Sequence, residues 1–348
     1  MEAVLTPLPP QTIHHVSESS GIAAVRRAGS QLASFLGLDE TVAGKVALVI
    51  TEAATNIFKH AGSGDILLRG LAAGDARGIE VLAIDKGPGF GNIEQAMRDG
   101  ISTVGSYGVG MGAMQRLADE FDLHADDTHG SALRMAVWSP GQSHRETEWI
   151  VGAVCLPLPS EEECGDAWSC ACDDGQLLLM VADGLGHGPE AARASGAAVA
   201  LVQPGSTFAP GAMLQLAHGA LQGSRGAAVA VACLDGDADE LRFAGIGNIT
   251  VSLHGGATAR HLVSHNGIVG SNMRKVQEFS MPLTDAAMLI MHSDGIGTRW
   301  DLDRYPGLSQ RHPSLIAAVL YRDHARGRDD ASIVVAQRQQ GSGGRGRR

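Results

Sequence analysis

Acidic residues stand at the ends of apolar segments in the second half of the chain. Two apolar runs lead into Asp183-Gly184 and Asp294-Gly295, the pair Asp329-Asp330 stands directly before a third run, and Asp166 precedes a shorter strand-like stretch. Each run has the length and composition of a buried β-strand. The pattern therefore predicts that several strands deliver carboxylates at their ends.

Carboxylates that converge in one cleft repel one another unless cations neutralise them. Ligand sets made only of oxygen favour Mg²⁺ or Mn²⁺ over zinc, and a glycine after the aspartate lets a backbone carbonyl approach a hard cation. Two such ions can activate a water for attack on a phosphoryl group, so the pattern indicates metal-dependent hydrolysis without a protein nucleophile. Asp-Gly is also a common turn dipeptide, and for any single pair a plain turn is the alternative.

A second group of polar residues occupies the first half of the chain. Glu52, Asn56 and His60 are spaced four residues apart, so on a helix they share one face, opposite the apolar residues of that segment. A polar face of this kind is usually solvated. It could also hold Mg²⁺ and a water beside a triphosphate.

Glycines follow this segment in two places. An apolar run ends in Asp85-Lys-Gly-Pro-Gly89, which contains Gly87, and further on Gly108, Gly110 and Gly112 lead into a helical pattern. Glycines before a helix suit phosphate binding, because bare backbone amides and the helix dipole both face the anion. One glycine motif alone is weak evidence, but the three elements in this order favour a nucleotide pocket.

Two kinds of scaffold are needed to position these residues. In the first half, helices are expected over 21–36 and 39–60, with strands at 65–71, 79–84 and 132–138. In the second half, helices are expected over 189–202, 211–221 and 313–324, and strands at 150–156, 176–182, 227–234, 240–244, 286–292 and 331–336. The mixture predicts an α/β or α+β first half and, for the second half, stacked sheets flanked by helices, so the chain as a whole is expected to be α+β. Domains are expected at 1–140 and 141–338, with a polar linker at 139–148 and a disordered tail at 339–348.

Composition narrows the class of protein. The 348 residues are 44% hydrophobic, enough for two cores, and the net charge of -11 argues against general nucleic-acid binding. The sequence shows neither a signal-peptide pattern nor an apolar stretch of about 18 residues, so no membrane span is expected. Five cysteines predict reduced thiols and a cytoplasmic location. Cys164, Cys170 and Cys172 cluster without the spacing of a zinc site and are interpreted as ordinary thiols.

The segment Asp183-Gly-Leu-Gly-His-Gly188 resembles the D-G-x-G-H-G signature of SpoIIE-type (RsbU/RsbX-like) phosphatases, a bacterial branch of the metal-dependent serine/threonine phosphatases. The resemblance spans about residues 148 to 337. Its further matches are Arg225-Gly-Ala-Ala-Val229, Ala244-Gly-Ile-Gly-Asn248, Asn266-Gly-Ile-Val-Gly270, Ser293-Asp-Gly-Ile296 and Asp329-Asp-Ala-Ser332.

The resemblance implies an α-β-β-α sandwich with two Mn²⁺ or Mg²⁺ ions. It implies that Asp183 bridges the two ions, that the Gly184 carbonyl binds one of them, that Asp294 and Asp329 hold the second, and that Asp166 completes the site. For His187 two interpretations stay equally open: it positions substrate or water, or it caps the helix that begins near residue 189.

Residues 16 to 138 resemble the GHKL (Bergerat) ATP-binding fold of histidine kinases, gyrase and Hsp90, and above all its anti-sigma-factor kinase (RsbW/RsbT-like) members. The motifs are Glu52-Ala-Ala-Thr-Asn56, Asp85-Lys-Gly-Pro-Gly89 and Tyr107-Gly-Val-Gly-Met-Gly112. The resemblance implies that Asn56 coordinates Mg²⁺ and Glu52 is the general base for transfer to a serine hydroxyl. It also implies that Asp85 accepts the adenine amino proton, that Gly87 and Gly89 shape the base pocket, and that Gly108, Gly110 and Gly112 cradle the phosphates.

Together the two resemblances predict a partner-switching regulator in stress-response or sigma-factor control. The second domain would dephosphorylate phosphoserine or phosphothreonine on a small antagonist (STAS-type) protein, and the first would bind ATP-Mg²⁺ and act as a serine kinase. The alternative is an anti-sigma-type binding module that sequesters its partner without phosphotransfer. A sigma factor or a stressosome-like scaffold is a further expected partner, and a homodimer is expected by analogy.

Overall fold

The structure is a computed structural model that describes residues 8–89, 108–126, 128–140, 148–173, 175–203, 205–206, 208–255 and 258–339. Most of the predicted linker, Tyr107 and nearly all of the predicted tail lie outside these residues. By contacts between residues the chain forms two compact units. One comprises Met1–Arg145 with Asp301–Asp323, and the other comprises Glu146–Trp300 with His324–Arg348.

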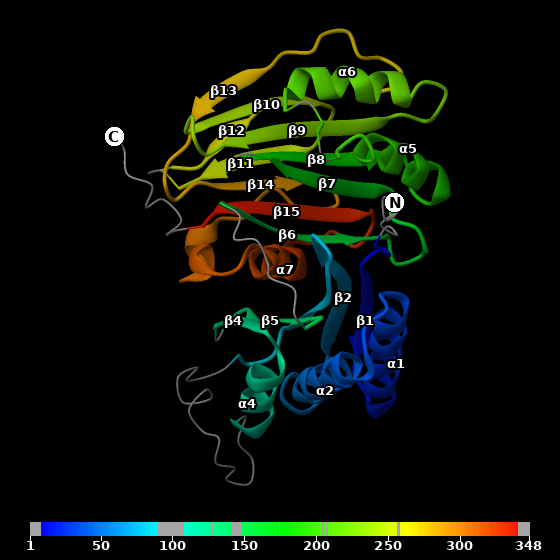
Figure 1. Ribbon diagram of the computed structural model, residues 1–348, viewed down its shortest axis with the longest axis vertical. Helices are drawn as coiled ribbons and strands as arrows, with labels where there is room; N and C mark the ends of the chain where they lie inside the picture. Colours follow the sequence, from blue (N-terminus) through cyan, green and yellow to red (C-terminus); the bar gives the residue numbers. More distant parts are fainter. Residues whose placement is uncertain are drawn as a thin grey trace. The chain divides into compact units, whose positions relative to one another are not determined.

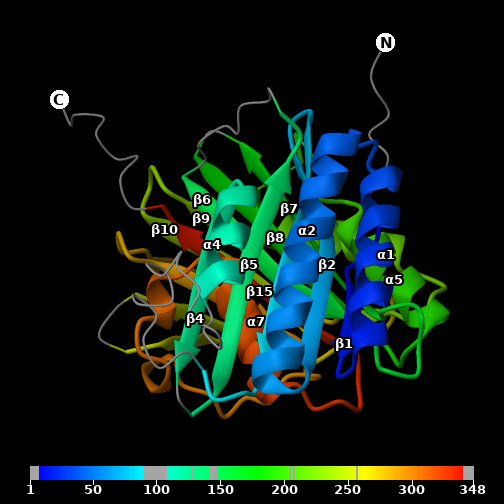
Figure 2. The ribbon, with the colours of Figure 1, turned by 90° about the horizontal axis from the view of Figure 1, so that it is seen from below.

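The first unit is built on one antiparallel sheet with the strand order β1-β2-β3-β5-β4. Its strands are β1 (Thr12–Val16), β2 (Gly64–Ala73), β3 (Ala76–Asp85), β4 (Glu120–Asp126) and β5 (Gly130–Trp138). Its helices include α1 (Ser19–Phe35), α2 (Glu40–Asn56), the π-helical turn η1 (Ile57–Ala61) and α4 (Gly108–Leu117). The helices α1 and α2 lie side by side (Figure 2).

Helix α2 carries the polar residues of the predicted nucleotide site on an apolar base. Its N-cap residue Asp39 accepts a hydrogen bond from the Val42 amide at 2.8 Å. Its apolar residues are buried together with apolar residues of the sheet in one core, which includes Val46, Ile50, Ile66 and Val81. By length and composition alone the segment Glu40–Ala61 could cross a membrane. In this fold its apolar face belongs to the core, which accounts for that composition.

The other face of this sheet is covered by residues 301–323. The segment comprises the short 3-10 helices η2 (Leu302–Arg304) and η3 (Leu308–Gln310) and most of α7 (Pro313–His324). Leu68 and Val81 face the helical core, so their strand neighbours Arg69 and Glu80 point to the opposite face. There Arg69 lies 3.4 Å from the Ser314 hydroxyl. The sheet is therefore buried on both faces.

The second unit contains two antiparallel five-stranded sheets, in the orders β13-β10-β9-β8-β7 and β12-β11-β14-β15-β6. The strands are β6 (Trp149–Leu156), β7 (Asp166–Asp173), β8 (Gln176–Gly184), β9 (Ala227–Asp235), β10 (Glu240–Ile246), β11 (Thr250–His254), β12 (Arg260–Leu262), β13 (Phe279–Pro282), β14 (Met288–His292) and β15 (Ala331–Arg338). Apolar residues from both sheets form one core. The helices α5 (Pro189–Val199) and α6 (Pro210–Ala220) pack along the first sheet (Figure 1). The mixed α+β architecture predicted from the sequence is confirmed.

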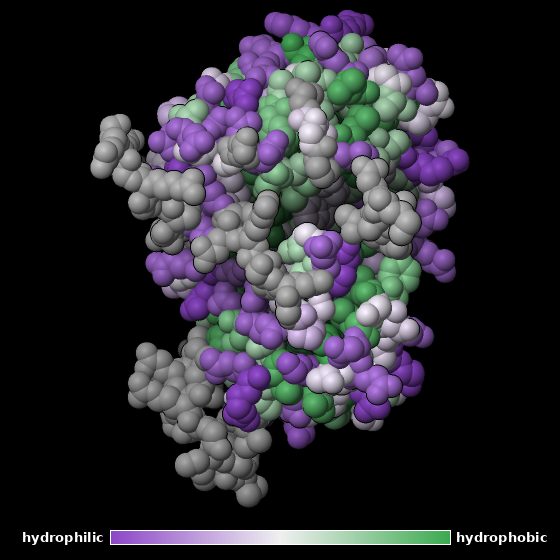
Figure 3. Space-filling view, viewed as in Figure 1, coloured by the Kyte–Doolittle hydropathy of each residue, from purple (hydrophilic) through white to green (hydrophobic). Residues whose placement is uncertain are grey.

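Hydrophilic residues are spread over the face drawn in Figure 3, with smaller hydrophobic areas between them. Among the described residues, the large apolar side chains that are well exposed include Phe35, Leu48 and Val263.

Candidate functional site

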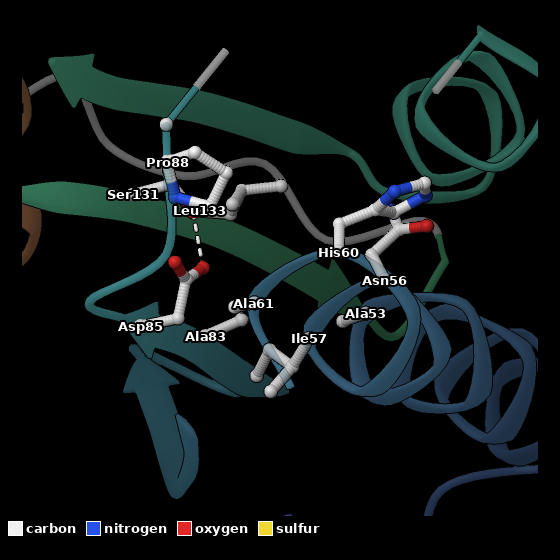
Figure 4. Close-up of a pocket in the computed structure, with 11 residues that line it drawn as sticks. Ala53, Asn56, Ile57, His60, Ala61, Ala83, Asp85, Pro88, Ser131 and Leu133 are labelled. Atoms are coloured by element: carbon white, nitrogen blue, oxygen red, sulfur yellow. Dashed lines mark hydrogen bonds between the residues drawn. The ribbon is translucent and has the colours of Figure 1, made fainter. Parts of the chain in front are cut away.

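A pocket in the first unit lies between α2 with η1 and the strands β3 and β5. It has an empty volume of about 370 Å³, open solvent included. Figure 4 shows Asn56 and His60 on one side of the pocket and Asp85 and Ser131 on the other. Its lining residues are Ala53, Asn56, Ile57, His60, Ala61, Ala83, Asp85, Pro88, Gly89, Ser131 and Leu133. The structure thus places three predicted nucleotide-binding residues, Asn56, Asp85 and Gly89, around one cavity.

Two hydrogen bonds hold the carboxylate of Asp85 at the edge of this pocket. Asp85 ends β3 and pairs directly with Ser131 on β5. The Ser131 hydroxyl donates to one oxygen of Asp85, and the Gly87 amide donates to the other at 2.8 Å. Two donors fix the orientation of this carboxylate, so its remaining lone pairs can accept a hydrogen bond from a ligand in a defined direction. Ser131 was not predicted from the sequence, because nothing in the sequence marks a serine on a neighbouring strand.

The N-terminus of α4 approaches the polar face of α2. A Cβ atom on Gly110 would lie 2.9 Å from Glu52 Oε2 and 3.3 Å from Asn56 Oδ1, so glycine permits this close approach. The glycines Gly108, Gly110 and Gly112 form the first turns of α4, where the sequence suggested a loop before the helix. The first amides of a helix lack intrahelical partners and can still bind an anion. Asn56 Nδ2 is buried without a hydrogen-bond partner.

In the second unit, neighbouring strands bring the predicted carboxylates together. Asp166 and Asp183 are directly opposite each other on β7 and β8. Asp294 follows β14, and Asp329 precedes β15, the strand beside it. Burial, and then the negative charges of the other aspartates, raise the pKa of Asp183 to about 8 and the pKa of Asp166 to about 7. The sequence prediction that these carboxylates converge thus agrees with their placement.

Asp330 is more enclosed than its neighbour Asp329. Its Oδ1 accepts a hydrogen bond from the Leu158 amide at 2.8 Å, and its Oδ2 is buried without a partner. A Cβ on Gly165 would lie 2.5 Å from that Oδ2. Asp329 is exposed. The family resemblance implied a ligand role for Asp329, whereas the residue pattern indicated only the pair Asp329-Asp330, because adjacent aspartates cannot be told apart without knowing which one turns inward.

The donor set fits a hard divalent cation. Among the residues that the structure describes, no three His, Cys, Asp or Glu side chains are arranged as ligands of one ion. Yet Asp166 Oδ2 and Asp330 Oδ2 are both buried without partners. The pKa of each of these two aspartates is raised first by burial and then by neighbouring carboxylates. A divalent cation would supply the missing counter-charge with oxygen ligands.

Two further contacts border the carboxylates. Asn248, the last residue of the Ala244–Asn248 motif, donates its amide to Asp294 Oδ2 at 2.8 Å. His187 Nδ1 lies 2.6 Å from Glu161 Oε1. The N-cap residue of α5 is Gly188, and this helix has no side-chain cap. The structure therefore does not place His187 as a helix cap.

Two family models match the chain. The model described as "Histidine kinase-like ATPase domain" matches residues 17–137, and that described as "Stage II sporulation protein E (SpoIIE)" matches residues 173–339. Among curated proteins, the serine/threonine-protein kinase RsbT of Bacillus subtilis (strain 168) is 34% identical over 117 residues, covering 34% of this chain and 88% of that protein. The phosphoserine phosphatase RsbX of the same organism is 24% identical over 134 residues, covering 38% of this chain and 67% of that protein.

The chain also resembles a solved structure. A chain from the structure described as "The bacterial stressosome: a modular system that has been adapted to control secondary messenger signaling" matches with a TM-score of 0.51 and 28% identity. The match covers 54% of this chain and 98% of that chain. The chain therefore belongs to the histidine kinase-like ATPase family that includes RsbT, and it joins this domain to a SpoIIE-type phosphatase domain.

Proposed function

We propose that this chain is a cytoplasmic partner-switching regulator that removes phosphate from phosphoserine or phosphothreonine on a small antagonist protein of the STAS type. The observation that carries the proposal is the convergence of Asp183 with four other aspartates, whose negative charges raise its pKa. These are Asp166, Asp294, Asp329 and Asp330. The similarity to the phosphoserine phosphatase RsbX supports the choice of substrate class.

In this proposal, Asp166, Asp183, the Gly184 carbonyl, Asp294 and Asp329 hold two Mn²⁺ or Mg²⁺ ions. The bound ions supply an activated water and neutralise charge on the phosphoryl group. Asn248 holds Asp294 in its orientation through the hydrogen bond of 2.8 Å. The contact of His187 Nδ1 with Glu161 leaves Nε2 as the ring nitrogen for substrate.

The test is phosphate release from a serine-phosphorylated antagonist-type protein, measured with Mn²⁺ and with EDTA. We expect metal-dependent release by the wild type and a loss of at least about 100-fold in Asp183→Asn, because an essential ligand is removed. Glu52→Ala is the matched control and should retain full release, since Glu52 belongs to the other unit. Full activity in Asp183→Asn would overturn the metal assignment.

The first domain, in the same proposal, binds ATP-Mg²⁺ and phosphorylates a serine on a partner. Asn56 coordinates the Mg²⁺, Asp85 accepts a hydrogen bond from the adenine amino group, and Glu52 acts as general base. The pocket between Asn56 and Asp85 and the approach of Gly110 to Glu52 support this role. The similarity to RsbT, and to a chain from a stressosome structure, favours a sigma-factor pathway or a stressosome-like scaffold as the setting. A homodimer is part of the proposal; nucleic acid and membrane are not.

The second candidate is a binding module that sequesters its partner without phosphotransfer. Incubation with labelled ATP and a panel of antagonist proteins separates the two. Label transfer that disappears in Glu52→Ala supports the kinase. A partner that binds tightly and gains no label, under conditions where ATP is bound, supports the binding module.

A further inference from the structure

A buried guanidinium contacts the backbone of Asp85 and Ser131, the two residues on the side of the pocket where adenine is proposed to bind. It belongs to Arg322 of α7, within the segment Asp301–Asp323 that is part of the first unit. Arg322 is 8% exposed. Its Nη1 donates to the backbone carbonyl of Ser131 at 3.1 Å and to that of Asp85 at 3.3 Å. One side chain thus holds the two strands that carry the Asp85–Ser131 pair.

The two carbonyls belong to residues whose side chains line the pocket. Asp85 and Ser131 face each other across β3 and β5, and the Ser131 hydroxyl donates to the Asp85 carboxylate. Gly130, which has a φ of +94°, leaves the Asp85 carbonyl accessible, since a Cβ there would lie 2.2 Å from that oxygen. The backbone of this pair is therefore held by Arg322, while its side chains face the pocket (Figure 4).

Arg322 is itself held in place. Its Nε and Nη2 donate to the carboxylate of Asp323 at 2.9 and 2.8 Å. Burial, followed by Asp323, raises the pKa of the Tyr305 hydroxyl, which is hydrogen-bonded to Asp323. The same segment is anchored to β4, where the His312 amide donates to Asp122 at 2.8 Å. Hydrogen bonds from a buried charged group are stronger than neutral ones, so the position of both carbonyls is well defined.

We propose that Arg322 is a positioning residue for nucleotide recognition, which fixes the Asp85–Ser131 pair so that the Asp85 carboxylate accepts a hydrogen bond from the exocyclic amino group of adenine. The inference rests on the proposed ATP binding. It assigns part of the base specificity of the first domain to a residue that lies, in the sequence, between Asp294 and Asp329 of the phosphatase motifs. A site that hydrogen-bonds one group of its ligand rejects analogues that lack this group, provided that its own polar atoms are held in place. Displacement of the Asp85 carboxylate should therefore reduce the preference for adenine more than it reduces the affinity for nucleotides in general.

The experiment measures the dissociation constants of ATP and ITP, with Mg²⁺, for the full chain by isothermal titration calorimetry. ITP carries a carbonyl oxygen where ATP carries the amino group, and it keeps the triphosphate. We expect the wild type to prefer ATP by roughly 10-fold or more. In Arg322→Met the ATP:ITP preference should fall at least about 5-fold, while ITP affinity changes little. Arg322→Lys, which can reach one carbonyl, should fall between the two.

Arg311→Met is the matched control. It removes another guanidinium of the same segment, which pairs with Asp122 at 3.2 Å on β4. Its ATP:ITP preference should equal that of the wild type. A merely structural role for Arg322 would weaken both nucleotides equally and leave the ratio unchanged.

The outcomes separate the two proposals. If the wild type binds neither nucleotide, the proposed ATP binding fails and this inference fails with it. If the wild type prefers ATP and both Arg322 variants keep that preference, only the role of Arg322 is overturned. If Arg322→Met gives no cooperative thermal transition, the ratio of Arg322→Lys decides: a reduced ratio supports the proposal and a wild-type ratio overturns it.

Discussion

Single residues in this protein show how burial and charge decide chemistry. Asp183 and Glu80 are both carboxylates in enclosed surroundings, but their neighbours differ. Around Asp183, burial and other aspartates raise the pKa to about 8. A bound cation would stabilise the ionised form of these carboxylates. Burial alone would raise the pKa of Glu80 too, but Arg69 and Arg134 outweigh it and lower the pKa to about 2. Glu80 is therefore an ionised carboxylate with a structural role, whereas Asp183 is a candidate metal ligand.

The lowered pKa of Glu80 predicts an acid-sensitive first unit. Arg69 and Arg134 donate to its two oxygens at 2.6 and 2.7 Å. Because the folded pKa lies below 4.5, the stabilisation is fully present above pH 4.5 and is lost as the pH falls towards 2. We expect Glu80→Gln to lower the free energy of unfolding at pH 7 by about 3 kcal/mol. That difference should shrink between pH 4.5 and 2 in urea titrations. A difference independent of pH would contradict this account.

At the scale of elements, close contacts between backbones fix the carboxylate site. The end of β8 meets the first turn of α5, and the turn after β14 meets the start of β15. A Cβ on Gly184 would lie 2.2 Å from the Ala191 carbonyl oxygen, and one on Gly295 would lie 1.9 Å from that of Asp330. The glycine of each Asp-Gly pair is therefore required by packing, whatever the role of its own carbonyl.

Gly184→Ala should destabilise the second unit. The added methyl meets a backbone oxygen, which cannot move without shifting α5, so we expect a loss of about 1–3 kcal/mol. Gly196→Ala, in α5 with nothing within 4 Å of the added Cβ, is the control and should be neutral or stabilising by up to about 1 kcal/mol. Thermal unfolding of both variants checks this. Equal stability of the two would show that the contact relaxes freely.

At the scale of the whole molecule, chain order and packing do not coincide. In the sequence, residues 301–323 come after β14 and Asp294. By contacts, however, they belong with residues 1–145. They cover the sheet face that carries Glu80 and Arg134, both of which are buried. An exposed charged network loses much of its strength to water and salt.

A fragment of residues 1–145 should consequently be less stable than the same residues in the full chain. Without 301–323, the apolar side chains of Leu67 and Leu82 on that face also meet water. Hydrogen exchange at the β3 amides is the direct measurement. We expect faster exchange in the fragment, while equal protection in fragment and full chain would show that the covering segment contributes nothing to the sheet.

Several elements of the fold could be predicted from the amino-acid sequence. Long runs with clear periodicity, such as 39–60 and 176–182, predicted elements that the structure contains as α2 and β8. Motifs at strand ends predicted carboxylates near one another, because antiparallel neighbours place the end of one strand beside the start of the next, as with Asp183 on β8 and Asp166 on β7. The domain bounds 1–140 and 141–338 and the roles of the site residues stay predictions. Short strands such as β12 (Arg260–Leu262) were missed, since three residues carry no readable period.

Other residues of the two candidate sites become evident only in the folded chain. Ser131 and Arg322 reach Asp85 from 46 and 237 residues away in the sequence, and Asn248 reaches Asp294 from 46 residues away. No local sequence pattern predicts the contacts of any of these three residues. Local periodicity reports which face of an element is buried, but it does not report which distant element covers that face. That choice depends on the packing of the whole chain, and here it places residues 301–323 in one compact unit with residues 1–145.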